Sequence, residues 1–208
     1  SNIQNPTVSY VNPGIYNIGL IVENSFGCKD TIENSFEALQ VPIADFVLSD
    51  DTICVGDSVI FISQSQYTDF INWDLSNGYT SNSFNFTYEF LDTTTVDVNL
   101  QAFSNNGCSD TIQVASSIIV INPPIADFFI ADTNYNPNFP FAGSLTFSNS
   151  SLNSDFYYWD FSNNDESYET NPTYEFNFNG LTTSNFILYA YNGCGYDTAT
   201  LKYEINYE

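Results

Sequence analysis

Asp69-Phe70-Ile71-Asn72-Trp73-Asp74 and Asp155-Phe156-Tyr157-Tyr158-Trp159-Asp160 are two copies of one pattern, with the second tryptophan 86 residues after the first (159 − 73). A second pattern keeps the same spacing, because Thr87-Tyr88-Glu89-Phe90 returns as Thr173-Tyr174-Glu175-Phe176. Self-similarity at a fixed period is the signature of a repeated structural unit. The repeat therefore decides the fold before any single element is assigned.

The start of the unit is repeated as well. Pro42-Ile43-Ala44-Asp45-Phe46 returns as Pro124-Ile125-Ala126-Asp127-Phe128, with a spacing of 82 residues (127 − 45). The later copy thus carries four extra residues before Ser144. We expect them in a loop at residues 134–140, because loops absorb insertions easily.

Residues 1–42 match only the second half of the unit. Asn5-Pro6-Thr7 corresponds to Asn171-Pro172-Thr173, and Phe26-Gly27-Cys28-Lys29-Asp30 corresponds to Asn106-Gly107-Cys108-Ser109-Asp110. Half a sandwich leaves strand edges and an apolar face bare, so this segment should need its missing strands from a longer parent chain or from another molecule. The sequence therefore divides into half a repeat at 1–42 and complete second and third repeats at 43–122 and 123–208.

Alternating polarity predicts that each unit is built of strands. Every second residue from Val96 to Ala102 is apolar, which is the period of a half-buried strand. Asn106-Gly107 and Asn192-Gly193 supply hairpin turns, since Asn and Gly tolerate the positive φ of tight hairpins. About seven short strands per unit is the count of an immunoglobulin-like (Ig-like) β-sandwich. We expect an all-β chain of Ig-like sandwich repeats arranged end to end.

The charge of the chain excludes two classes of partner. The chain has 25 acidic residues and two basic residues, Lys29 and Lys202, which gives a net charge of −23. It has no Arg and no His. A surface without cations cannot neutralise phosphates, so we expect no nucleic acid and no anionic membrane as direct partner. No stretch approaches the roughly 18 apolar residues of a membrane span, so direct membrane insertion is not expected. The first residues lack the basic and apolar regions of a signal peptide, which predicts an internal or processed fragment.

Few residues could carry chemistry. Trp73 and Trp159 could stack on sugar rings, but a tryptophan on a central strand of this kind of sandwich fills the core, and we assign both to the structural core. No His, Arg or Lys cluster is present to activate a nucleophile, so we expect no enzyme and no catalytic residue. Calcium is the one cofactor considered, with Asp50, Asp51 and Asp57 as weak candidate ligands that lack EF-hand spacing.

Two stretches resemble a known family. Trp73-Asp74-Leu75-Ser76-Asn77-Gly78 and Trp159-Asp160-Phe161-Ser162-Asn163-Asn164 resemble the W-D-F-G-D-G signature of polycystic-kidney-disease (PKD) domains, and they depart from it where Ser-Asn replaces Gly-Asp. Ile53-Cys54-Val55-Gly56-Asp57-Ser58 and Asn106-Gly107-Cys108-Ser109-Asp110-Thr111 resemble the repeats of giant surface adhesins of gliding, type IX-secreting bacteria. The resemblance covers nearly the whole chain and implies a PKD-type, Ig-like fold.

Four cysteines without His or a C-x-x-C pair favour disulfides, and hence an oxidising compartment, over a zinc site. In an Ig-like topology the loop of Cys54 lies at the opposite end of its repeat from the hairpin of Cys108, too far for a bond, and it abuts the hairpin of Cys194 in the next repeat. We predict a Cys54–Cys194 disulfide between repeats, with the partners of Cys28 and Cys108 outside the chain. A Cys54–Cys108 disulfide and free buried thiols are the two alternatives.

The same resemblance implies a modification. The O-glycosylation motif of that bacterial group is Asp, then Ser or Thr, then a small or aliphatic residue. Glycan is expected on some of the six matches, first at the loop positions Thr52 and Thr93. The candidate acceptors are Thr31, Thr52, Ser58, Thr93, Thr111 and Thr198.

These features favour non-catalytic spacer repeats of a large secreted cell-surface adhesin, with gliding motility as the more specific expectation. The expected partners are neighbouring repeats of the same chain, and surface polysaccharide or another cell-surface ligand. Two alternatives stay open. One is a PKD spacer module of a secreted hydrolase, and the other is a carbohydrate-binding module.

Overall fold

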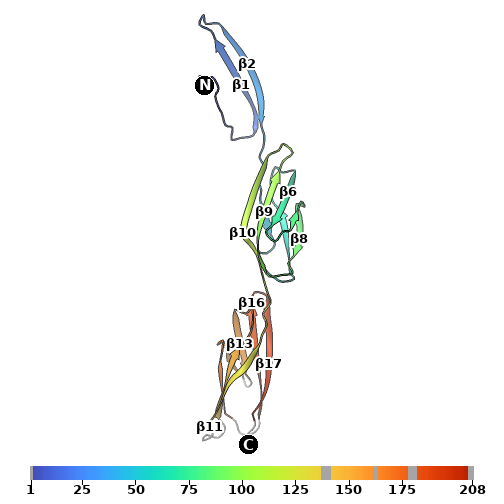
Figure 1. The fold of residues 1–208 in the computed structure, drawn as a ribbon, viewed down its shortest axis with the longest axis vertical. Coiled ribbons are helices and arrows are strands. Elements are labelled where there is room, and N and C mark those ends of the chain that lie inside the picture. Colours follow the sequence, from blue (N-terminus) through green and yellow to red (C-terminus); the bar gives the residue numbers. More distant parts are fainter. Residues whose placement is uncertain (1, 137–141, 162–163, 178–181, 206–208) are drawn as a thin grey trace. The chain divides into compact units, whose positions relative to one another are not determined.

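Strands are the regular secondary structure of this chain (Figure 1). The computed structural model describes residues 2–136, 142–161, 164–177 and 182–205, which contain seventeen strands and no helix. The all-β prediction is confirmed. Within these ranges there is accordingly no helix with the length and apolar character that crossing a membrane requires.

The chain divides into two compact units. The first unit contains Ser1–Ser49, Val59–Tyr88 and Val96–Ser117, and the second contains Asp50–Ser58, Glu89–Thr95 and Ile118–Glu208. Most of the second repeat therefore belongs to the first unit, while its segments Asp50–Ser58 and Glu89–Thr95 and the end of its last strand belong to the second. The repeat boundaries at 42 and 122 stay a prediction from the sequence.

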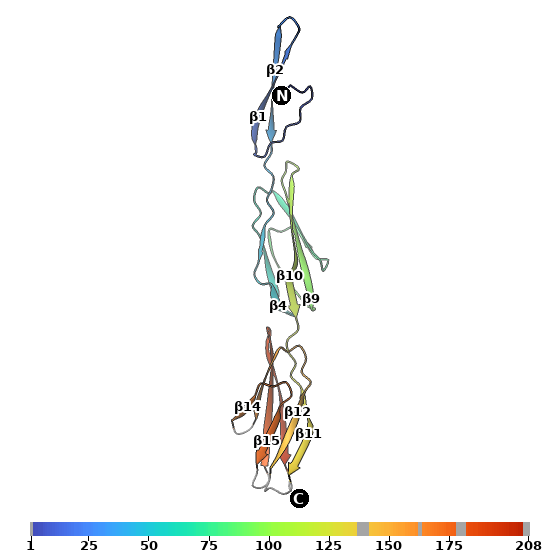
Figure 2. The same cartoon turned by 90° about the vertical axis from the view of Figure 1, so that its left-hand side faces the viewer.

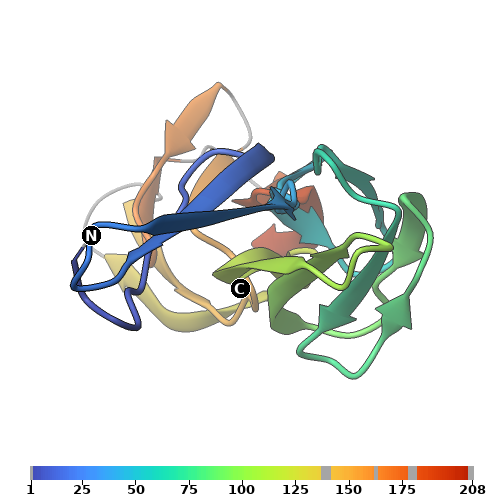
Figure 3. The same ribbon diagram turned by 90° about the horizontal axis from the view of Figure 1, so that it is seen from above.

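The first two strands form a hairpin that joins no larger sheet. β1 (Gly14–Glu23) and β2 (Lys29–Ala38) pair without interruption over their whole length. In the turn, the side-chain oxygen of Asn24 accepts hydrogen bonds from the backbone N–H groups of Phe26 and Cys28, at 2.9 and 3.0 Å. Figure 3 shows the hairpin, in blue, as a twisted two-stranded ribbon.

The hairpin leaves open the positions that a complete repeat buries. Ile18, Leu20 and Val22 are 51%, 57% and 54% exposed. Their equivalents in the second repeat are Val98, Leu100 and Ala102, each with no exposed surface. The residue types of a sandwich core are thus present, but the strands that would cover them are not among the described residues.

The second repeat forms two sheets. One has the order β4-β10-β9-β6-β7 and the other the order β3-β5-β8. The strands are β3 (Phe46–Leu48), β4 (Thr52–Cys54), β5 (Ser58–Ser63), β6 (Phe70–Leu75), β7 (Thr80–Ser81), β8 (Asn85–Glu89), β9 (Thr94–Phe103) and β10 (Ser109–Ile121). The indole of Trp73 has no exposed surface and lies 5.4, 5.7 and 5.6 Å from the rings of Phe46, Phe61 and Phe86.

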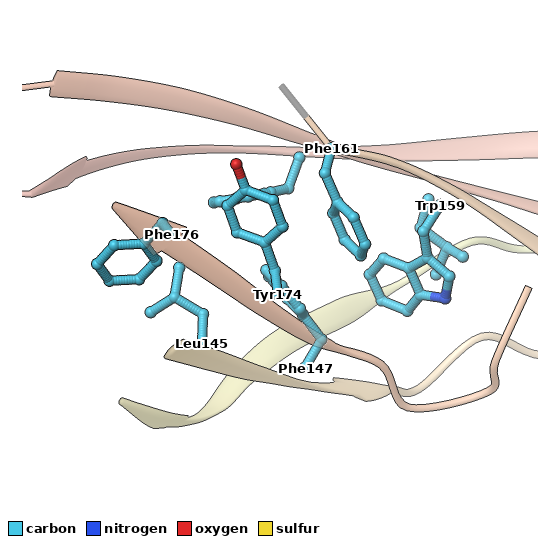
Figure 4. Packing of buried hydrophobic residues seen from close by; sticks show 8 residues of the cluster. Leu145, Phe147, Trp159, Phe161, Tyr174 and Phe176 are labelled. Atoms are coloured by element: carbon cyan, nitrogen blue, oxygen red, sulfur yellow. The ribbon is translucent and has the colours of Figure 1, made fainter. Parts of the chain in front are cut away.

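The third repeat forms the sheets β11-β12-β15 and β14-β13-β16-β17 (Figure 2). The strands are β11 (Phe128–Asn136), β12 (Ala142–Asn149), β13 (Phe156–Phe161), β14 (Asp165–Ser167), β15 (Thr173–Asn177), β16 (Thr182–Asn192) and β17 (Gly195–Ile205). Between the sheets lies a core of Leu145, Phe147, Trp159, Phe161, Tyr174, Phe176, Phe186 and Leu188 (Figure 4). Two sheets that face one apolar layer, antiparallel except for the β4–β10 pair of the second repeat, make each complete repeat an Ig-like β-sandwich.

The insertion in the third repeat is only partly a loop. Asn134 pairs with Ser144, and Tyr135 pairs with Gly143, so β11 continues through residues expected to be irregular. The loop prediction is wrong for residues 134–136, because β12 offers a free partner over this stretch and the ladder continues. The remainder of the predicted loop, 137–140, lies outside the described residues, as do Ser162 and Asn163 of the PKD-like signature.

One of the two predicted turns has a different geometry. Gly107 has φ of 83°, and its N–H donates to the carbonyl oxygen of Ser104 at 3.0 Å, so the glycine takes the expected positive φ but follows the central turn residues Asn105 and Asn106, and Asn106 does not take a positive φ. In the third repeat β16 runs to Asn192 and β17 begins at Gly195, which takes the positive φ of 112° in place of Gly193. The turn is therefore shifted, because the hairpin pairs Asn192 with Gly195.

Candidate functional site

The second unit contains a disulfide that links the second and third repeats. Cys54 and Cys194 are joined with an S–S distance of 2.06 Å and a Cα–Cα distance of 5.7 Å. This is the pairing that the sequence favoured over a Cys54–Cys108 bond. Cys28 is free and exposed, and Cys108 is free and half-buried, so their predicted partners outside the chain stay a prediction.

Cys54 is held by the end of strand β10. β4 runs parallel to β10, with Cys54 opposite Ile121, and the N–H of Val55 donates to the carbonyl oxygen of Ile121 at 3.0 Å. The carboxylate of Asp57 accepts from the N–H of Cys54 at 3.1 Å, and the N–H of Asp57 donates back to the carbonyl oxygen of Cys54 at 2.9 Å. Asp57 therefore closes a tight turn that fixes the cysteine.

Cys194 is held by Asn192. The side-chain oxygen of Asn192 accepts from the N–H of Cys194 at 2.7 Å. Its amide nitrogen donates to the carbonyl oxygens of Asn122 and Asn153, at 2.8 and 2.6 Å. One side chain thus ties the cysteine turn to the segment between the two repeats, a role that the turn prediction for Asn192 did not include.

A shallow depression of about 300 Å³ lies beside the disulfide. It is lined by Asp50, Thr52, Ile53, Cys54, Asp57, Ser58 and Gly193. Two of the three calcium candidates, Asp50 and Asp57, reach it, but the Asp57 carboxylate already accepts a backbone hydrogen bond. Within the described ranges no three acidic, His or Cys side chains gather as a metal site would require. Calcium binding stays a weak prediction.

The six candidate glycosylation residues are all exposed. Thr52 and Ser58 line the depression next to the disulfide, and Thr93 lines a second depression of about 370 Å³ in the same unit. Thr31, Thr111 and Thr198 lie on β2, β10 and β17. Exposure permits modification at each position, and the modification itself stays a prediction.

Both tryptophans are fully buried. The indole N–H of Trp73 donates to the carbonyl oxygen of Ser83 at 3.0 Å, and that of Trp159 donates to the carbonyl oxygen of Glu169 at 2.9 Å. Each indole thus fills the core and satisfies a backbone group. Neither offers a face on which a sugar could stack.

A repeated aspartate that the sequence reasoning missed joins the two ends of each repeat. Asp110 accepts a hydrogen bond from the N–H of Ala44 at 2.8 Å, and Asp197 accepts one from the N–H of Ala126 at 2.9 Å. The hydrogen bond from Ala126, with a second from Thr198, lowers the pKa of Asp197 below its usual range. The signal was in the sequence, because both aspartates and both alanines occupy equivalent repeat positions.

Comparisons with known proteins leave the family open. No protein family matches the sequence, and no curated protein matches it. An amphioxus IgVJ-C2 molecule is 14% identical with a TM-score of 0.41, over 73% of this chain and 98% of the other. A structure of carbohydrate-binding modules from the β-sandwich superfamily is 13% identical with a TM-score of 0.38, over 79% and 78% of the two chains.

A structure of Dpr2 Ig1-Ig2 in complex with DIP-Theta Ig1-Ig3 is 14% identical with a TM-score of 0.33, over 94% of this chain and 74% of the other. Scores this low carry no conclusion about function. The class of the molecule follows from its own strands, and it is an all-β protein with Ig-like sandwich repeats.

Proposed function

We propose that this chain is a run of PKD-type spacer repeats from a large secreted cell-surface adhesin, and that the repeats do no catalysis themselves. The observation that carries the proposal is the Cys54–Cys194 disulfide. It links one repeat to the next instead of stabilising a single sandwich. A covalent bond between successive repeats is useful in a spacer, because a spacer depends on how its repeats are connected.

The rest of the chemistry agrees with an extracellular spacer. Disulfides persist in oxidising compartments, which include the cell surface. The net charge of −23 keeps neighbouring copies of a surface protein apart and soluble. The depression at the disulfide and the second depression of the same unit are lined mainly by polar side chains, together with Ile53, Val120 and Ile121, and neither lining contains a base-activated nucleophile.

A role in gliding motility and export by type IX secretion are the finer parts of the proposal. They rest on the resemblance of the cysteine-containing motifs to repeats of gliding bacteria. Glycan on exposed residues such as Thr52 and Thr93 belongs to the same proposal. Intact mass measurement of the protein isolated from its source would detect it, and a mass equal to that of the bare polypeptide would remove this part alone.

Deleting the repeats from the parent gene tests the proposal against its main alternative. Cells that carry the deletion should lose attachment to surfaces, while hydrolytic activities in the culture medium stay unchanged. A spacer module of a secreted hydrolase predicts the reverse, with normal attachment and a weakened activity toward polymeric substrates. Labelling of intact cells with an antibody against these repeats supplies the control, since a surface protein must be labelled without permeabilisation.

A further inference from the structure

The outer surface of the four-stranded sheet in the third repeat carries five tyrosines, which we call the tyrosine face. The tyrosine face consists of Tyr158, Tyr168, Tyr189, Tyr191 and Tyr196. Alternation along β13 and β16 places Trp159, Leu188 and Ala190 in the core, so Tyr158, Tyr189 and Tyr191 point to the opposite side. Tyr168 and Tyr196 are 70% and 63% exposed.

The rings of the tyrosine face form one connected surface. Tyr158 is paired with Tyr189 across β13 and β16, and Tyr191 with Tyr196 across β16 and β17. The ring of Tyr158 lies 5.4 Å from that of Tyr168 and 5.5 Å from that of Tyr189. The ring of Tyr196 lies 5.9 Å from Tyr189 and 5.4 Å from Tyr191. The face therefore spans three neighbouring strands and the segment after β14.

Two carboxylates lie at the border of the tyrosine face, and no basic side chain is paired with them among the described residues. Asp160 and Glu166 are directly opposite each other on β13 and β14, and like charges in that arrangement destabilise a sheet. The hydroxyl of Tyr158 donates to Glu166 at 3.3 Å. Partial burial, together with the charges of Glu166 and Asp160, raises the pKa of Tyr158. Lys202, the one cation of the unit, pairs with Asn185 further along the sheet.

The second repeat shows that the sandwich does not need these groups. At the positions equivalent to Tyr158, Tyr168, Tyr189, Tyr196 and Glu166 it has Asn72, Asn82, Gln101, Ser109 and Thr80. The pairing is the same in both repeats, because Asn72 faces Gln101 and Asp74 faces Thr80. The second repeat thus has amides and hydroxyls in place of four of the five rings and of the second carboxylate, while the position of Tyr191 holds Phe103. The tyrosine face is an addition to the sandwich.

We propose that the tyrosine face binds a basic segment, rich in Arg or Lys, of a partner protein. Ring faces attract guanidinium and ammonium groups, and the Asp160–Glu166 pair supplies the opposite charge that such a group needs. A cation placed there also relieves the repulsion between the two carboxylates. The proposal does not depend on the spacer role, since a spacer and a hydrolase module could both carry such a face.

The test exchanges residues between the two repeats. The quadruple variant Tyr158→Asn, Tyr168→Asn, Tyr189→Gln and Tyr196→Ser gives the third repeat the side chains of the second and leaves the net charge at −23. Binding is measured by calorimetry at physiological salt, using a synthetic peptide of alternating Arg and Gly, the same peptide with Glu for Arg, and a neutral glucose oligosaccharide. We expect the Arg peptide alone to bind, and the variant to bind it about tenfold more weakly.

Two further variants separate the face from the overall charge. Glu166→Thr should weaken binding of the Arg peptide, while Glu37→Gln, which removes one charge from an exposed position of β2, should leave binding unchanged. The reverse exchange, with Asn72→Tyr, Asn82→Tyr, Gln101→Tyr, Ser109→Tyr and Thr80→Glu, should raise the stoichiometry from one peptide to two, and it decides the matter if the quadruple variant fails to fold. Equal binding by wild type and the quadruple variant overturns the proposal, as does oligosaccharide binding that only the tyrosines support.

Discussion

At the scale of single residues, each tryptophan combines packing with one hydrogen bond that no other residue type would supply. Trp159 has no exposed surface, lies 5.0 Å from the ring of Phe128 and donates to the carbonyl oxygen of Glu169. Phenylalanine would fill less of this volume and would leave the carbonyl without its donor. Each tryptophan therefore fixes the packing of its core more precisely than another apolar side chain would, because it also forms a hydrogen bond.

We expect Trp159→Phe to destabilise the second unit by about 1–3 kcal/mol, from the cavity and the lost hydrogen bond together. Chemical denaturation followed by circular dichroism measures the change. The fluorescence of the remaining Trp73 then reports the first unit, whose transition should not move. Phe156→Leu is the matched control, because Phe156 is 72% exposed and should cost little. If Trp159→Phe lowered the free energy of unfolding as little as Phe156→Leu, the indole would not be needed for the stability of the core.

The aspartate that joins the ends of the third repeat gives a pH dependence. The folded state lowers the pKa of Asp197, so the carboxylate contributes stability above its unfolded pKa, and this contribution is lost as the pH falls through the folded pKa. Asp197→Asn should therefore be less stable than wild type near neutral pH, by a small amount because the group is exposed. The two proteins should converge in acid. Melting curves between neutral and strongly acidic pH measure this, and a constant difference would contradict it.

At the scale of elements, alternation in the sequence predicts the inward residues of strands well. Val96, Val98 and Leu100 are all fully buried, as a period of two requires. The same pattern does not specify which residue types occupy the outward positions. The tyrosine face was therefore not predicted. Alternation also does not predict contacts between residues far apart in the sequence, such as the hydrogen bond from the N–H of Ala126 to the carboxylate of Asp197.

Boundaries were predicted less well than strands. The extension of β11 depends on β12 being available as a partner, which is a property of the folded sheet and not of residues 134–136 themselves. The Cys54–Cys194 disulfide could be favoured from the sequence because the repeat predicts the topology, and that topology places Cys54 near Cys194 and far from Cys108. The side chain of Asn192 that holds this junction was predicted only as a turn residue.

Gly143 on β12 is required by close packing. A Cβ atom there would lie 2.7 Å from the backbone oxygen of Asn134 and 2.7 Å from the ring of Phe176. Because the backbone oxygen belongs to a paired strand, Gly143→Ala should destabilise the second unit by about 1–3 kcal/mol. Gly193→Ala is the control, since its Cβ would meet only Ile121 at an ordinary 3.6 Å. The denaturation midpoints of the two variants measure the difference in stability. Equal midpoints would contradict the packing argument.

The disulfide fastens the turn at residues 54–57 to the hairpin of the third repeat. Cys54→Ser with Cys194→Ser should lower the stability of the second unit by about 2–4 kcal/mol, since the cross-link restricts the unfolded chain. Hydrogen exchange should rise around 52–57 and 192–195, while the amides flanking Trp73 keep their protection. Faster exchange throughout the first unit as well would mean that the bond stabilises more than its own surroundings.

At the scale of the whole molecule, residues 14–38 form a hairpin that no described strand completes into a sandwich. Isolated two-stranded hairpins are marginally stable in water. Thr7 is equivalent to Thr87, so a copy of residues 42–80 placed directly before Ser1 restores the order of a complete repeat. We expect the amides of β1 to change from rapid to slow hydrogen exchange in this fusion, as Ile18, Leu20 and Val22 become covered.

The fusion also tests the cysteine pattern. The cysteine of the copied segment then precedes Cys108 as Cys54 precedes Cys194, so the two free thiols, Cys28 and Cys108, should fall to one in a thiol titration. A fusion in which the copied cysteine is replaced by serine should gain the slow exchange but keep both thiols. Unchanged exchange in β1 would show that the hairpin does not accept these strands.

The bond between Cys54 and Cys194 has a mechanical consequence that follows from connectivity alone. When the two ends of the chain are pulled apart, tension runs from Cys54 across the sulfur atoms to Cys194 and bypasses the polypeptide between them, a separation of 140 residues. Trp73 and Trp159 both lie inside this bypassed stretch. Under oxidising conditions the strands between the two cysteines carry no tension, and load enters the two sandwiches only through β3, β4 and β17, which lie outside the bypassed stretch. After reduction, pulling would also stretch the strands that carry the two tryptophans.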